Sequence, residues 1–214
     1  MACDNEGDER LGAALVNPMV RALQSHLSER LLAATDPMVT SERKALVGDI
    51  GELTLRNIKE RLGHEVISSA FGNPNQPTTA QMNDLITIGP DGALEVYDSK
   101  ATASTRALKT TGENGDPNLP KPAMGRLTSG DRQLSDSYNQ ERVAQVLMFE
   151  DDPAGHAPQA IAVKINLKSH TYQEWRVDSS GHLADPVGPA QDCSLEIAEA
   201  IAELSEDASY TRLG

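Results

Sequence analysis

Two aspartates and a lysine lie close together in a segment whose pattern predicts a β-hairpin. Asp84 opens one apolar run, and Asp98 and Lys100 lie near the end of the next run. The sequence Pro90-Asp-Gly92 between the two runs is typical of a tight turn. Because side chains alternate along a strand, Asp98 and Lys100 share one face, and pairing across the turn brings Asp84 close to residues 96–98.

This combination of side chains is suited to phosphodiester hydrolysis. The reaction needs an activated water molecule and relief of negative charge on the phosphate. Two aspartates offer hard oxygen ligands for Mg²⁺ or Mn²⁺, and such an ion supplies both effects as a Lewis acid. A lysine beside them can orient or deprotonate the water and stabilise the transition state. The three residues therefore predict a metal-dependent hydrolytic site.

Asp84, the hairpin and Asp98-Ser-Lys100 resemble the D…(D/E)xK motif of the PD-(D/E)XK nuclease superfamily. Asn83 precedes the first aspartate, where the family often has proline. The family's restriction-endonuclease-like core has the order helix, three strands, helix, strand, which is also the order expected here for residues 41–167. Many members carry a glutamate on the first helix, and Glu52 is positioned for that role.

The resemblance implies a role for each of these residues. Asp84, Asp98, the backbone carbonyl of Ser99 and Glu52 would hold Mg²⁺ or Mn²⁺. Lys100 would position the attacking water. The implied activity is that of a metal-dependent endonuclease, with DNA favoured as its substrate and tRNA as the alternative.

A second motif narrows the resemblance. The sequence Arg132-Gln-Leu-Ser135 follows an insertion rich in Gly, Pro and Thr. It looks like the RQ(M/L)S entry to the second helix in nuclease domains of bacterial polymorphic toxins, which contact-dependent or type VI secretion systems deliver. The resemblance implies a toxin of interbacterial competition that acts in the cytoplasm of a target cell and has a cognate immunity protein. It also implies that Arg132 and Gln133 lie near the substrate phosphates or the water molecules bound to the metal.

The net charge of −13 opposes a nucleic-acid-binding function, because phosphate contacts dominate such binding. Basic residues are nonetheless concentrated between positions 100 and 132, so a local basic surface is expected there. The expected substrate contacts are Arg106, Lys109, Arg126, Arg132 and Gln133.

Hydrophobic periodicity predicts an α/β fold with a mixed sheet flanked by helices. Helices are expected over residues 11–34, 40–62, 131–149 and 194–205, and strands over 64–71, 84–88, 93–101, 159–167 and 171–177. A single nuclease domain over residues 1–214 is expected. Its parts are an N-terminal helical extension (1–39), the nuclease core (40–177) and a C-terminal tail with a helix (178–214).

Several function classes are excluded by the sequence. No apolar run approaches the roughly 18 residues of a membrane span, and the acidic N-terminus is no signal peptide. The histidines and the two cysteines have no zinc-ligand spacing. Two alternatives remain open: a non-catalytic acidic protein that binds a basic partner, such as an immunity or regulatory protein, and a housekeeping repair or restriction nuclease with the same core.

Overall fold

The computed structural model describes residues 25–26, 29, 40–69, 83–103, 133–147 and 158–206. The elements in chain order are α2 (Thr40–Arg61), β1 (Glu65–Ser69), β2 (Leu85–Ile88), β3 (Leu94–Thr102), α3 (Asp136–Leu147), β4 (Gln159–Asn166), β5 (Thr171–Val177), β6 (Leu183–Pro186), β7 (Gln191–Asp192) and α4 (Ser194–Glu206).

The strands form one mixed sheet in the order β1-β2-β3-β4-β5-β6, and β7 also pairs with β5. The first three strands are antiparallel, β4 is parallel to β3, and β5 returns antiparallel to β4. A parallel step needs a crossover connection, and α3 lies in that connection. The predicted α/β class, with a mixed sheet flanked by helices, is therefore confirmed.

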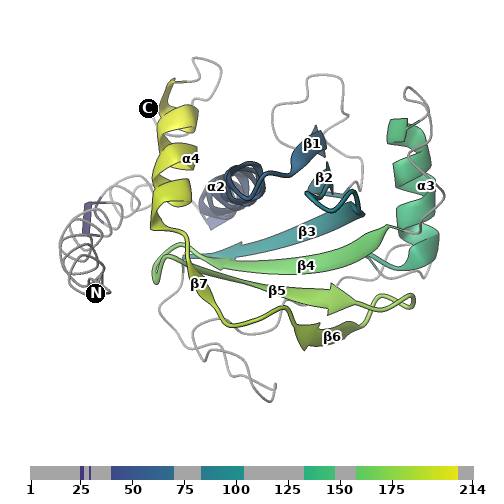
Figure 1. Cartoon of the computed structure of the whole chain (residues 1–214). Helices are drawn as coiled ribbons and strands as arrows, with labels where there is room; N and C mark the ends of the chain where they lie inside the picture. Colours follow the sequence, from purple (N-terminus) through teal and green to yellow (C-terminus); the bar gives the residue numbers. More distant parts are fainter. Residues whose placement is uncertain are drawn as a thin grey trace, which may run out of the picture.

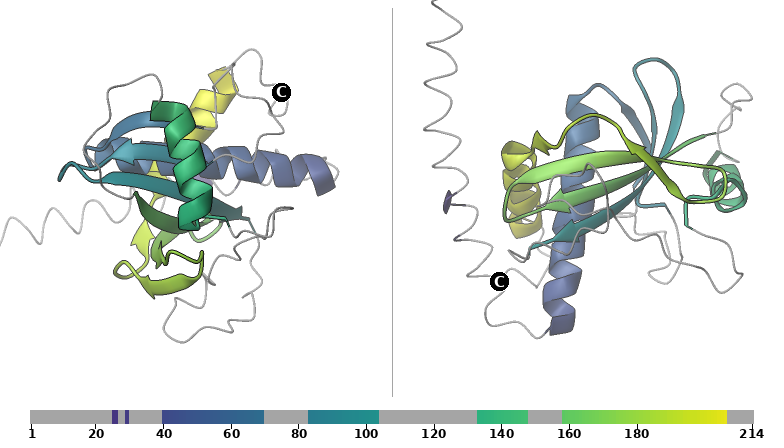
Figure 2. Two further views of the ribbon diagram at one scale, coloured as in Figure 1. Left: turned by 90° about the vertical axis from the view of Figure 1, so that its right-hand side faces the viewer. Right: turned by 90° about the horizontal axis from the view of Figure 1, so that it is seen from below.

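The helices are divided between the two faces of the sheet. α2 and α4 lie together on one side, and α3 is separated from them at the other end of the sheet (Figures 1 and 2). One core cluster joins α2 and α4 to side chains such as Tyr97 and Ile165. The other joins Leu134 and Val143 to Val96 and Ala162. Alternate residues of β3 thus face different cores.

The start and end of α2 agree with the predicted helix. Its C-terminus has a Schellman motif, in which the His64 N–H donates to the Lys59 carbonyl and the Gly63 N–H donates to the Glu60 carbonyl, both at 3.0 Å. Gly63 has a φ of 84°, which explains why glycine ends this helix.

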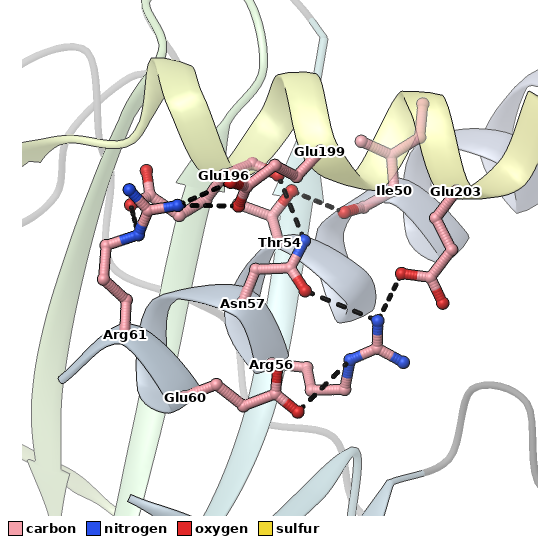
Figure 3. Close-up of polar contacts among 9 residues, drawn as sticks. All are labelled: Ile50, Thr54, Arg56, Asn57, Glu60, Arg61, Glu196, Glu199 and Glu203. Atoms are coloured by element: carbon pink, nitrogen blue, oxygen red, sulfur yellow. Dashed lines mark hydrogen bonds and ion pairs between the residues drawn. The ribbon is translucent and has the colours of Figure 1, made fainter. Parts of the chain in front are cut away.

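α4 is held on α2 by polar contacts along their exposed edge (Figure 3). Arg61 bonds to Glu199 at 2.7 Å and pairs with Glu196 at 3.0 Å, and Arg56 pairs with Glu203. Beneath these ion pairs Ile197, Ile201 and Leu204 of α4 are buried in the core. Apolar burial is the main source of stability at this interface, since exposed ion pairs contribute little each.

One predicted helix lies mostly outside the described residues, and two other segments differ from the sequence-based prediction for local reasons. Residues 25, 26 and 29 are helical, and the rest of the predicted helix over 11–34 lies outside the described residues. Leu134 precedes α3 instead of lying within it, and it has a φ of 61°. β6 and β7 were not predicted, because their segment is short and rich in Pro and Gly; it nevertheless adds two strands to the sheet. No described helix is long and apolar enough to cross a membrane.

Candidate active site

The hairpin of β2 and β3 brings the predicted residues together. Leu85 pairs with Tyr97, and the Asp84 N–H donates to the Tyr97 carbonyl at 3.0 Å, so Asp84 lies beside Asp98. In the turn the Gly89 N–H donates to the Ala93 carbonyl and the Gly92 N–H donates to the Gly89 carbonyl, both at 2.8 Å. The predicted turn and the predicted pairing are both confirmed.

Direct contacts fix the two aspartates. The Ser99 N–H donates to Oδ2 of Asp84 at 2.6 Å, which joins the start of β2 to the middle of β3. Asp98 forms an ion pair with Lys100, two residues along the same strand. The Asp98 side chain is buried, whereas that of Lys100 is 33% exposed, so the ammonium group is open to solvent. The site is therefore a buried carboxylate pair beside an accessible cation.

Glu52 approaches the site from α2 because that helix packs very closely on β3. A Cβ at Gly51 would overlap the Cβ of Ala101, so only glycine permits this contact. Glu52 is the next residue along the helix. Its carboxyl is close enough to Asp84 and Asp98 for their negative charges to raise its pKa. The structure thus brings Asp84, Asp98 and Lys100 together and places Glu52 within electrostatic range of them.

The electrostatics of the site show an excess of negative charge. Burial, together with the charges of Asp84, Asp49 and Asp98, raises the pKa of Glu52 to about 8. Burial and Asp98 together raise the pKa of Asp84 to about 7. Burial also raises the pKa of Asp98, although the contact with Lys100 opposes the shift. The positive charge of Lys100 does not offset three carboxylates.

A divalent cation fits this site by chemistry and by charge. Carboxylate oxygens are ligands that Mg²⁺ and Mn²⁺ prefer, and a bound cation would remove the cost of the clustered negative charge. The described carboxylates are not, however, arranged as the ligands of a metal ion. Within the part of the chain that the structure describes, no three His, Cys, Asp or Glu side chains form a ready-made metal site. Binding an ion there requires the side chains to rotate toward one another.

Helix α3 supports the hairpin through a buried polar chain. Asn83 donates to the Asn139 side chain at 3.3 Å, and Asn139 donates to the Leu134 carbonyl at 2.9 Å. Both asparagines are buried. Asn83 therefore joins the start of β2 to α3 next to Asp84.

Tyr138 of α3 also belongs to the site. Burial raises its pKa to about 12, and the charges of Asp98 and Asp84 act in the same direction. Arg142 stacks on its ring, with 3.7 Å between the guanidinium carbon and the ring centre. From the sequence Tyr138 was predicted only as a buried residue of the helix, since its spacing gave no sign of its position beside the aspartates.

Lys164 of β4 is a further residue that the sequence reasoning missed. It pairs directly with Lys100 in the parallel register of β3 and β4. A single lysine in an otherwise apolar strand gives no signal of function. Its significance follows only from the pairing of β3 with β4, which are 57 residues or more apart in the chain.

Of the five predicted substrate contacts, the structure describes only Gln133. Arg106, Lys109, Arg126 and Arg132 lie outside the described residues. Gln133 is half-buried in the turn before α3. Glu95 accepts a hydrogen bond from Tyr97 and pairs with His64, so it belongs to a structural network on the α2 face.

Comparison of the chain with models of protein families, with curated proteins and with solved structures gave no match. A function for this chain is therefore inferred from its own residues and their geometry.

Proposed function

We propose that this protein is a metal-dependent endonuclease of the PD-(D/E)XK type. The observation that carries the proposal is the pairing of Asp84 with Asp98 across the hairpin, with Lys100 in contact with Asp98 and Glu52 beside them. The order α2, β1, β2, β3, α3, β4 agrees with the core order of that superfamily. The three residues of the motif thus lie on one hairpin, and Glu52 lies on the helix that packs against it.

Each side chain has a role that its position supports. Asp84 and Asp98, together with Glu52 and the Ser99 carbonyl, would hold Mg²⁺ or Mn²⁺, which supplies Lewis-acid activation of water and of the phosphate. Ser99 orients Asp84 through its backbone N–H. Lys100 is exposed enough to reach a phosphate, and its ammonium group can orient the attacking water and stabilise the charge of the transition state.

The proposal also includes a substrate and a biological setting. DNA is the favoured substrate and tRNA the alternative. The Arg132-Gln-Leu-Ser135 motif, which leads into α3, supports a role as a toxin domain of interbacterial competition, acting in the cytoplasm of a target cell and neutralised by a cognate immunity protein.

The test is cleavage of supercoiled plasmid and of total tRNA with Mg²⁺ or Mn²⁺. Wild-type protein is expected to cut at least one substrate, and Asp98→Ala and Lys100→Ala are each expected to lower the rate by at least about a hundredfold. Asp185→Ala and Lys168→Ala are matched controls, because both residues are exposed and belong to other parts of the fold.

Two outcomes would contradict the proposal. Cutting that survives both site substitutions would mean that another site, or a contaminant, does the chemistry. A folded wild-type protein that cuts neither substrate would favour the non-catalytic acidic binding protein, whose net charge of −13 suits a basic partner.

A further inference from the structure

A row of polar residues crosses the face of the sheet that otherwise carries apolar side chains toward α3. Lys100 of β3 pairs with Lys164 of β4, and Lys164 pairs in turn with Gln173 of β5. Residues in register on neighbouring strands point to the same face. The adjacent row on that face contains Ala162, which is fully buried in the α3 cluster. The apolar core against α3 therefore ends at Ala162, and the row of polar residues lies next to it on the same face.

The two lysines differ in what they contact. Lys100 forms an ion pair with Asp98, whereas the side chain of Lys164 has no ion pair or hydrogen bond to any other residue that the structure describes. Its side chain is half-buried. Burial lowers the pKa of Lys164, and the positive charge of Lys100 lowers it further. The fold thus holds two lysines side by side, and only Lys100 has an anionic partner, Asp98.

Gln173 adds a second observation at the same place. Its side chain is only 3% exposed, and its Nε2 donates to the Gly188 carbonyl at 3.1 Å. Its Oε1 is buried without a hydrogen-bond partner among the described residues. Leaving such an atom unpaired costs free energy, but a phosphate offers only acceptor oxygens and would not pair with it, so the phosphate contact rests on the two lysines.

We propose that Lys164 binds a backbone phosphate next to the scissile one, and so extends the site along the nucleic-acid strand from β3 to β4. The inference rests on the proposed function. The scissile phosphate is assigned to Lys100 and the carboxylates, so the cation on the next strand, roughly 4.8 Å away at the backbone, contacts the neighbouring phosphate. Such a contact is made equally in the ground state and the transition state, so it acts on KM and not on kcat.

The experiment is steady-state cleavage of plasmid DNA, or of total tRNA if that is the substrate cut, by Lys164→Gln and Lys164→Arg at several salt concentrations. Lys164→Gln is expected to raise KM by about tenfold, to leave kcat within about twofold, and to reduce the slope of log KM against log salt by about one. Lys164→Arg keeps the charge and is expected to leave KM within about threefold. Lys168→Gln, an equal loss of charge at an exposed position of the β4–β5 turn, is the control.

Results other than these would contradict the proposed phosphate contact. An unchanged KM in Lys164→Gln, or a lower kcat at unchanged KM, would overturn the phosphate contact while the nuclease function still holds. The same tenfold rise in Lys164→Arg would show that charge is not what matters, and this readout holds even if Lys164→Gln folds poorly. A wild-type protein that cuts neither nucleic acid would remove the proposed function and this inference together.

Discussion

Glu52 is the residue whose protonation most directly links the candidate site to the stability of the fold. Its pKa is raised from the ordinary 4.5 to about 8, first by burial and then by Asp84, Asp49 and Asp98. A carboxyl with a higher pKa in the folded protein than in the unfolded chain binds its proton more tightly when folded. Glu52 therefore lowers the free energy of unfolding progressively as the pH rises from 4.5 to about 8.

The expected result is a melting temperature that falls over this pH range in metal-free wild-type protein, and falls less in Glu52→Gln. Added Mg²⁺ or Mn²⁺ should raise the melting temperature of the wild type more at pH 8 than at pH 5, because an ion that binds only the folded state stabilises it. Glu60→Gln is the control, since Glu60 is an exposed glutamate of the same helix. Equal pH slopes in wild type and Glu52→Gln would show that Glu52 carries no buried charge.

The proximity of Asp84, Asp98 and Lys100 could be predicted from the sequence because it depends on local rules. Alternation along β3 places Asp98 and Lys100 on one face, and a recognisable turn sets the pairing with Asp84. Tyr138 and Lys164 could not be found in the same way. Their proximity to the site depends on where α3 and β4 return to the sheet, and no local pattern encodes that.

At the scale of elements, the position of α2 on β3 decides whether Glu52 reaches the aspartates. The two elements touch where Gly51 lies against Ala101. Alanine is ordinarily favoured over glycine in a helix by about 1 kcal/mol, so a substitution here sets helix propensity against packing. Packing should win, because the added methyl group would overlap a side chain attached directly to the strand backbone.

Gly51→Ala is expected to lower the free energy of unfolding by about 1–3 kcal/mol and to reduce cleavage, since α2 must move away from β3. Gly48→Ala is the matched control in the same helix. A Cβ at Gly48 meets nothing within 4 Å, so this change should raise stability by up to about 1 kcal/mol. Urea unfolding of both variants measures the difference. A stable, fully active Gly51→Ala would mean that the close contact does not position Glu52.

Some of the helices and strands could be predicted from the sequence and others could not. Helices α2 and α4 were predicted because their apolar residues recur at helical spacing and because Gly63 ends α2. The strands β6 and β7 were not, since their short polar segments become strands only by pairing with β5. Leu134 was assigned to a helix by its apolar character, yet its positive φ marks the turn before α3.

At the scale of the whole molecule, an acidic protein must bind a polyanion through a few local cations. The net charge is −13, while the candidate site exposes Lys100 and holds Lys164 beside it. The repulsion of nucleic acid by the net negative charge and its attraction by these two lysines act over different distances. Repulsion between the molecule and nucleic acid extends over about 30 Å at 0.01 M salt but only about 10 Å at 0.1 M, whereas contacts within the site are far shorter.

Cleavage should therefore depend on salt in two opposing ways. Raising the salt from low values screens the overall repulsion and speeds association, and raising it further weakens the phosphate contacts. The expected kcat/KM for the cleaved nucleic acid passes through a maximum near about 0.1 M, where a nuclease with a basic surface would show a continuous fall. Initial rates at constant low metal concentration, from about 0.01 to 0.5 M salt, measure this profile. A continuous fall would place the acidic residues away from the path of the nucleic acid and would make the local cations the dominant electrostatic feature of the encounter.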